Sequence, residues 1–111
     1  MASHKLPPDV RAALQELKES LLHLYGERLK GVSLFGSYAR GDYHPESDVD
    51  VLIVLAGQVR AFEEISRYSK AISDICLRHD VLISTVPVSE QWVSERLEPL
   101  FENVRREGVA L

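Results

Sequence analysis

The sequence contains few of the residues that stabilise or target other classes of protein. Its 111 residues include one cysteine, one tryptophan and one methionine, and only 7% of them are aromatic. The single cysteine, Cys76, excludes an internal disulfide, and its helical spacing from neighbouring isoleucines indicates core packing. No apolar run approaches the roughly 20 residues that span a bilayer, and no signal peptide opens the chain. We therefore expect a cytoplasmic protein without membrane contact.

The chain also lacks an excess of positive charge. Thirteen lysines and arginines against 17 aspartates and glutamates give a formal net charge of −4. Polynucleotide binding depends largely on basic residues that neutralise phosphates and release counterions, so a nucleic-acid substrate is disfavoured. A nucleotide already chelated by metal needs no such basic field. The length predicts a single domain over residues 1–111, small enough for another chain to complete its site.

The apolar pattern predicts an α/β fold, with a small mixed sheet flanked by helices. The order is helix, strand, loop, strand, helix, strand and helix, and the helical crossover favours parallel pairing of the last two strands. Strands are predicted at residues 31–35, 51–55 and 80–88. The first helix begins at Pro7-Pro8-Asp9 and ends at Gly26. Its predicted core positions are Val10, Leu14, Leu17, Leu21 and Leu24.

Two later helices are predicted on either side of the last strand. The crossover helix carries Phe62, Ile65, Ser69, Ile72 and Cys76 at helical spacing. The charges of this helix, Glu63 and Glu64 among them, are expected on a solvated face. Ser89 is the predicted cap of the final helix, which Pro99 should kink or restart. The apolar stripe of that helix is Val93, Leu97, Leu100 and Val104.

The most informative segment joins Gly36 and Ser37 to Asp48-Val49-Asp50 across ten residues, immediately before the apolar run 51–55. Because side chains alternate along a strand, Asp48 and Asp50 would share one face with Cα atoms about 6.6 Å apart. Such a pair suits two divalent ions about 3.5–4 Å apart, as in displacement at phosphorus. Glycine allows backbone amides to approach a phosphate, and the serine hydroxyl adds a donor. The alternative is a solvated strand end and an ordinary turn.

The segment GSYARGDYHPESDVDV, from Gly36 to Val51, closely resembles the signature of the minimal nucleotidyltransferases of the DNA polymerase β-like superfamily. The resemblance implies the α+β nucleotidyltransferase fold and transfer of a nucleoside monophosphate, here AMP from ATP. By that likeness, Gly36 and Ser37 hold the triphosphate, and Asp48 and Asp50 are the catalytic ligands of two Mg²⁺ ions. Arg40 matches a basic position of the family. It is either a phosphate contact or a solvated loop charge.

The family also uses a third carboxylate, on a later strand beside the first pair. Asp80 is the only acid of the segment 80–88, so we assign it the role of third metal ligand and catalytic residue. Two alternatives remain open. Asp80 could end the preceding helix, or a two-residue shift of the strand would place Leu82 at the ligand position. In the second case metal binding would be weaker and the general base would be missing.

The resemblance also implies a partner. Family members are often encoded beside a small helical HEPN protein and act as its antitoxin, in some cases by adenylylating one of its tyrosines. We therefore expect the acceptor hydroxyl on a HEPN-type partner, and homo-oligomerisation through the helix carrying Trp92 and Phe101 is a further option. Two other functions remain. One is a nucleotide-binding module that masks its partner without catalysis, and the other is a small-molecule enzyme of the antibiotic nucleotidyltransferase type.

Overall fold

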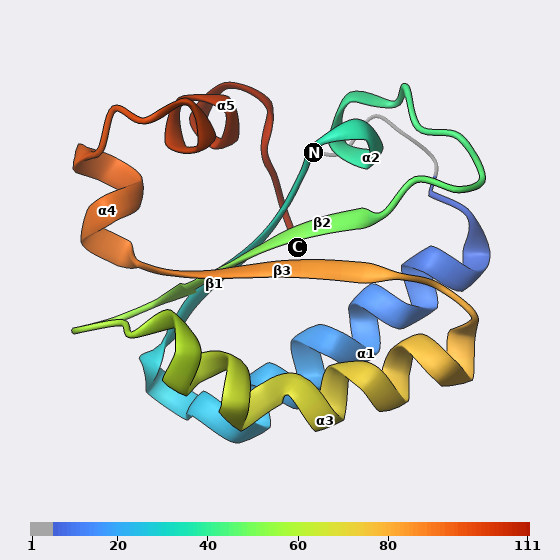
Figure 1. Ribbon diagram of the computed structural model, residues 1–111, viewed down its shortest axis with the longest axis horizontal. Helices are drawn as coiled ribbons and strands as arrows, with labels where there is room; N and C mark the ends of the chain where they lie inside the picture. The colour runs from blue at the N-terminus through green and yellow to red at the C-terminus, as the bar shows by residue number, and fades with distance from the viewer. Residues whose placement is uncertain (1–5) are drawn as a thin grey trace.

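We describe a computed structural model of the chain over residues 6–111 (Figure 1). The elements in chain order are the helix α1 (Pro8–Tyr25), the 3-10 turn η1 (Gly26–Arg28), the strand β1 (Leu29–Phe35), the one-turn helix α2 (Ser37–Arg40), the strand β2 (Val49–Leu55), the helix α3 (Ala61–His79), the strand β3 (Ile83–Ser89), the helices α4 (Glu90–Glu95) and α5 (Pro99–Glu107), and the strand β4 (Val109–Ala110). Among these helices, none is long and apolar enough to cross a membrane.

The strands form one mixed sheet in the order β3-β2-β1-β4. The strands β2 and β3 are parallel, as the helical crossover between them predicts, because α3 returns the chain to the edge where β2 began. The strand β1 pairs antiparallel with both β2 and β4. The two-residue strand β4 has no counterpart in the sequence prediction, since so short a strand leaves no periodic pattern.

The central strand β2 is buried on both faces, as its unbroken apolar run predicts. The helices α1 and α3 cover one face of the sheet, and α4 and α5 lie on the other (Figure 1). Alternate residues Val49, Val51, Ile53 and Leu55 belong to the core shared with α1 and α3. Leu52 and Val54 belong to a second core with Phe101 and Val104 of α5. The even-numbered side chains of β2, and therefore Asp50, point toward the α5 side.

The helix predictions are correct in place but wrong in part for the buried face. Phe62 is 83% exposed, and Leu24, Ile65 and Leu97 are exposed as well, while α3 buries Glu64, Tyr68, Ile72 and Ile75. The predicted and the observed buried residues of α3 both have helical spacing, but packing against α1 buries a face displaced by one residue from the predicted one. Ser89 caps α4 as predicted, its Oγ accepting from the amide of Gln91 at 3.3 Å, and Pro99 starts a separate helix.

Glu64 corrects the expectation of a solvated charged face, because its side chain is only 2% exposed. It accepts hydrogen bonds from the Tyr25 hydroxyl at 2.9 Å, from Arg28 Nη2 at 2.8 Å and from Arg67 Nη1 at 3.1 Å. Burial by itself would raise the pKa of Glu64, but the bonds from Arg28 and Tyr25 reverse that effect and lower the pKa below its ordinary value. The cluster ties η1 to α3 at the end of the sheet opposite the Gly36 turn.

We predict that Glu64→Ala lowers the free energy of unfolding by about 2–4 kcal/mol, since it leaves Arg28 half-buried without its carboxylate. Urea unfolding at pH 7 measures the change. Glu63→Ala is the matched control, because Glu63 is the next residue along the chain and forms an exposed ion pair with Arg60. This variant should change the free energy of unfolding by less than about 0.5 kcal/mol. Equal effects of the two variants would contradict a structural role for the cluster.

The same cluster predicts a pH dependence. A carboxyl whose pKa is lowered by folding adds stability that is complete above its unfolded pKa, 4.5, and is lost as the pH falls through the lower folded value. The native chain should therefore lose stability below about pH 4.5. Glu64→Gln should show a smaller loss over that range than the native chain does. Urea midpoints measured from pH 7 to pH 3 give the comparison.

Candidate active site

The turn after β1 requires glycine at position 36 for two reasons. Gly36 has φ 74° and ψ −153°, a conformation that residues with a side chain rarely adopt. A Cβ atom placed on it would also collide with the Asp50 carboxylate, reaching Oδ2 and lying 3.2 Å from Cγ. The backbone of the turn is thus pressed directly against the side chain of Asp50. Residues 14 positions apart in the sequence meet here.

Ser37 begins α2, which is a single turn. The carbonyl of Gly36 accepts from the amides of Ala39 and Arg40, both at 3.1 Å, and the carbonyl of Ser37 accepts from Gly41 at 2.9 Å. Tyr38 and Ala39 are buried, and Ser37 is half-buried. The short helix therefore anchors the turn to the core, while the serine remains accessible beside the Gly36 backbone.

Arg40 lies at the end of this helical turn, three residues after Ser37. Its guanidinium pairs with Asp42, Nε to Oδ2, at 3.1 Å and with Glu107 of α5, Nη1 to Oε2, at 3.5 Å. The hydrogen bond that Arg40 donates to Asp42 is the main cause of the raised pKa of Arg40. The positive charge of Arg40 also acts on Asp50, whose pKa it lowers. Arg40 thus contributes a positive charge near Asp50, and this charge is already paired with two other carboxylates.

The two aspartates differ in their surroundings. Asp48 is exposed and directly precedes β2, whereas Asp50 is half-buried within β2, opposite Phe35 of β1. Burial, followed by the negative charge of Asp48, raises the pKa of Asp50 above its ordinary value, and Arg40 only partly offsets the rise. A half-buried carboxylate beside a second carboxylate is suited to a divalent cation, which supplies the missing positive charge. The donor set therefore fits Mg²⁺.

Asp80 does not join this pair. It is the residue that ends α3, exposed and in the left-handed conformation with φ 52° and ψ 48°, and β3 begins three residues later at Ile83. Aspartate tolerates this conformation better than most residues do, which explains its place at the helix end. Within residues 6–111, no group of three His, Cys, Asp or Glu side chains gathers as a metal site. Asp80 thus has the helix-ending position that the sequence left open as an alternative, and its role as third ligand stays a prediction that this position does not support.

The neighbours of the pair are Ser84 on β3 and Leu82 just before that strand. The carbonyl of Leu82 accepts from the amide of Val49 at 2.8 Å, and its side chain is 62% exposed. Ser84 is the register partner of Asp50, and its Oγ donates to Oδ2 of Asp48 at 3.1 Å. The two-residue shift considered for Leu82 is thus close to what the structure shows. Ser84 itself escaped the sequence analysis, because serine in a strand carries no catalytic signal until the register is known.

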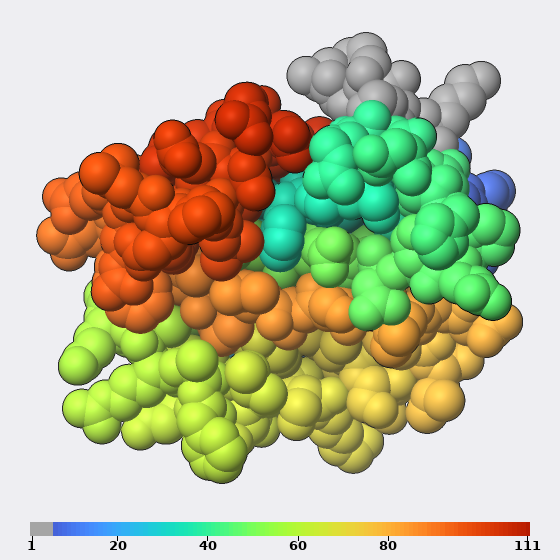
Figure 2. Space-filling view, turned by 45° about the horizontal axis from the view of Figure 1, so that its top comes forward, coloured from blue at the N-terminus to red at the C-terminus, as the bar shows by residue number. Residues whose placement is uncertain are grey.

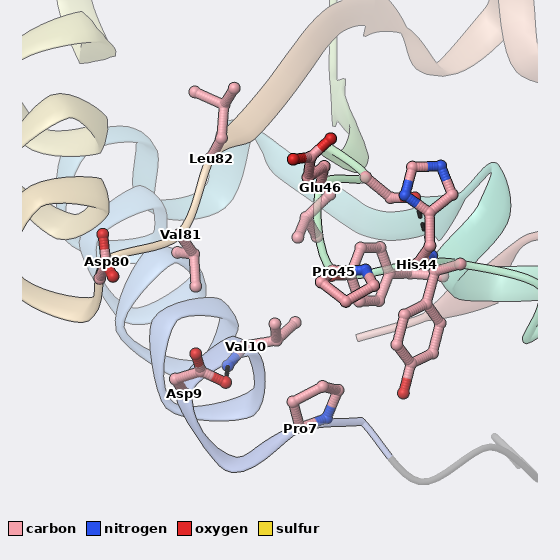
Figure 3. A pocket seen from close by; sticks show the side chains of 13 residues that line it. Pro7, Asp9, Val10, His44, Pro45, Glu46, Asp80, Val81 and Leu82 are labelled. Atoms are coloured by element: carbon pink, nitrogen blue, oxygen red, sulfur yellow. Dashed lines mark hydrogen bonds between the residues drawn. The ribbon is translucent and has the colours of Figure 1, made fainter.

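A cavity of about 580 Å³ adjoins the site (Figure 3). It lies between the start of α1, the loop around His44 and the turn from α3 to β3, and Asp9, Glu46 and Asp80 border it from those three segments. The rings of Tyr38 and Tyr43, stacked at 4.2 Å between centroids, form part of its wall. Figure 2 shows β2 reaching the surface between α2, β3 and the C-terminal helices. Ser47 and Val49, the chain neighbours of the exposed Asp48, line the cavity as well.

Comparison with known proteins identifies similar chains. Residues 14–103 match the family model described as a nucleotidyltransferase domain. The Methanocaldococcus jannaschii protein named "Putative protein adenylyltransferase MJ0604" is 38% identical over 100 residues, which are 89% of this chain and 94% of the relative.

Two solved structures resemble the fold. A toxin-antitoxin crystal structure with AMP-PNP has a TM-score of 0.58 and 22% identity, over 84% of this chain and 68% of that one. A toxin-antitoxin MntA-HpeT structure, of a variant with two aspartates two positions apart changed to glutamate, has a TM-score of 0.58 and 20% identity, over 85% and 68%. At these identities the likeness concerns the fold.

We predict that Gly36→Ala destabilises the chain by at least about 1–2 kcal/mol, because alanine pays the cost of positive φ and its methyl group displaces the Asp50 carboxylate. Chemical denaturation at pH 7 measures the loss. The matched control is Gly31→Ala in the preceding strand β1, where an added Cβ would lie an ordinary 3.9 Å from Val54 Cβ. This variant should stay within about 0.5 kcal/mol of the native chain. A Gly36→Ala variant as stable as the control would contradict the strained turn.

Proposed function

The chain belongs to the nucleotidyltransferase domain family, and on that premise we propose that it transfers AMP from ATP to a hydroxyl group of a protein partner. The observation that carries the proposal is the contact between the Gly36 turn and Asp50, with Asp48 exposed beside it. This contact places the backbone amides of the turn, which can bind a phosphate, next to two carboxylates, which can bind a metal. The nucleotide and the metal are then bound side by side.

Each residue has a separate task in this proposal. The amides beside Gly36 and the Ser37 hydroxyl donate to the terminal phosphates, and Arg40 adds positive charge near them. Asp48 and Asp50 hold the divalent ions. When bound, Mg²⁺ neutralises charge on the triphosphate and lowers the pKa of the attacking hydroxyl. The half-buried position of Asp50 limits water around the carboxylate and keeps its orientation constant.

The transfer itself needs one bond to form and one to break. The acceptor oxygen bonds to the α-phosphorus, the bond from that phosphorus to the bridging oxygen breaks, and pyrophosphate leaves. The acceptor proton passes to solvent, because no third carboxylate gathers beside Asp48 and Asp50 within residues 6–111. The chain thus contributes mainly binding and orientation, and the acceptor is expected to present a hydroxyl that ionises readily, such as that of tyrosine.

Two similarities support a protein acceptor. The relative MJ0604 is named as an adenylyltransferase of proteins, and the MntA-HpeT structures are toxin-antitoxin complexes. We extend the family resemblance to a HEPN-type helical partner that this chain neutralises as an antitoxin. The partner would supply both the acceptor hydroxyl and the surface that holds it in line with the α-phosphate.

A second function has one observation in its favour. The residues beside the aspartates are Leu82, just before β3, and Ser84 on β3, and neither is an acid. With two carboxylates, the site would bind a nucleotide more weakly than with three, and it would lack a general base. The chain could then neutralise its partner by covering it. Stable complex formation without transfer would identify this masking function.

We predict metal-dependent modification of the partner. The native chain, purified in tandem with its bound partner and incubated with Mg-ATP, should raise the partner's mass by one AMP. Asp48→Asn and Asp50→Asn should slow the transfer at least a hundredfold, because each removes a metal ligand. Asp74→Asn, a change of a partly exposed residue on α3 at the other face of the sheet, should transfer at the native rate. Intact-mass spectrometry gives the readout, and an unmodified partner in a stable complex would favour masking.

We also predict opposite effects of Asp50→Asn with and without metal. Without divalent ions the variant should melt at a higher temperature than the native chain, because it removes a half-buried charge that Asp48 repels. With Mg²⁺ and AMP-PNP the native chain should gain stability and the variant should not. Thermal melts in EDTA and in Mg²⁺ test both halves. A native chain that gains nothing from Mg²⁺ and AMP-PNP would contradict the metal site.

A further inference from the structure

Ser84 occupies the position on β3 that faces the carboxylate pair. In the parallel register it is the partner of Asp50, and its Oγ donates to Oδ2 of Asp48 at 3.1 Å. Side chains alternate along β3, so Ser84 shares a face with Val86 and Val88, which pack in the same core as Leu52 of β2. The serine is therefore held at the edge of a packed layer, with its hydroxyl turned toward the site.

Asp48 depends on this contact more than Asp50 does on any single neighbour. It is exposed and precedes the first paired residue of β2, so the ladder does not restrict its side chain. Among the side-chain hydrogen bonds of residues 6–111, the one from Ser84 is the only bond that its carboxylate accepts. A free carboxylate loses rotational freedom when it binds a cation, whereas one already held by a neighbour loses less.

We infer that Ser84 is a positioning residue of the metal site. Its hydroxyl holds Oδ2 of Asp48, so that the carboxylates of Asp48 and Asp50, at the start of the same strand, would be ready to bind a cation. The inference rests on the proposed metal-dependent function and adds a third side chain to the site, from the strand where a carboxylate was expected. It also assigns the site a lower negative charge than a three-carboxylate site has, and therefore a weaker hold on divalent ions.

The test is Mn²⁺ binding to the purified chain without nucleotide, measured by electron paramagnetic resonance. Ser84→Ala should weaken Mn²⁺ binding about tenfold, since removing a group that orients a metal ligand costs at least this much in other metal sites. Ser84→Thr keeps the hydroxyl and suits a strand, so it should bind within about twofold of the native chain. Ser33→Ala, on β1, is the matched serine control and should bind as the native chain does.

A second variant tests the place of the side chain independently. Ser84→Asp adds a carboxylate where the hydroxyl stands, so it should bind Mn²⁺ about tenfold more tightly than the native chain, because affinity rises with the charge of the ligand set. In EDTA the same variant should melt at a lower temperature than the native chain, since its new charge lies against Asp48. Melting curves in EDTA also establish that each variant is folded before its affinity is compared.

The outcomes separate this inference from the proposed function. A native chain that binds no Mn²⁺ would overturn the metal-dependent function and the inference together. A native chain that binds Mn²⁺ while Ser84→Ala binds equally well would overturn only the role of Ser84. The same conclusion would follow from a Ser84→Thr variant as weak as Ser84→Ala, or from a folded Ser84→Asp variant that binds no more tightly than the native chain.

Discussion

Burial of β2 on both faces is the constraint on which the site depends. Alternate side chains of this strand pack into two different cores, so it has no freedom to slide or rotate relative to its neighbours. Asp50 lies within the strand and inherits this rigidity, and Asp48 lies directly before it. The Gly36 turn ends the adjacent strand β1 and closes onto Asp50. A functional group placed on such a scaffold keeps its geometry at no further cost in ordering.

Two partly or fully buried carboxylates of this chain illustrate opposite uses of the same chemistry. Glu64 is enclosed by three donors, two of them arginines, and its pKa is lowered. Asp50 is half-buried beside another carboxylate, and its pKa is raised. The first arrangement is electrostatically complete and stabilises the fold. The second is incomplete, which is characteristic of a site that awaits a cation or a ligand.

The residues that make up the site also affect the function that the chain can have. Ser84 of β3 and Leu82 just before that strand lie beside the aspartates, where the family resemblance implied an acid. In the proposed function, two carboxylates and a hydroxyl make up the metal site. The affinity of such a site for metal and nucleotide depends strongly on the position of Asp48. In the proposed transfer, the surface of the partner orients the acceptor.

The order of the longer helices and strands follows from the sequence alone, because it depends on local periodicity and on turn residues such as Gly36 and Pro99. The short elements α2 and β4 do not. The close approach of Gly36 to Asp50 depends on two neighbouring strands, and the residues that make it are recognisable from their spacing and chemistry.

Four features needed the tertiary structure: the burial of Glu64, the exposed face of Phe62, the helix-ending role of Asp80 and the contact of Ser84 with Asp48. Each depends on the face a helix presents or on where it ends. A helix turns its side chain by about 100° per residue, so a displacement of one residue exchanges a buried side chain for an exposed one. The start of β3 likewise depends on where α3 ends, and only packing against α1 and β2 sets that point.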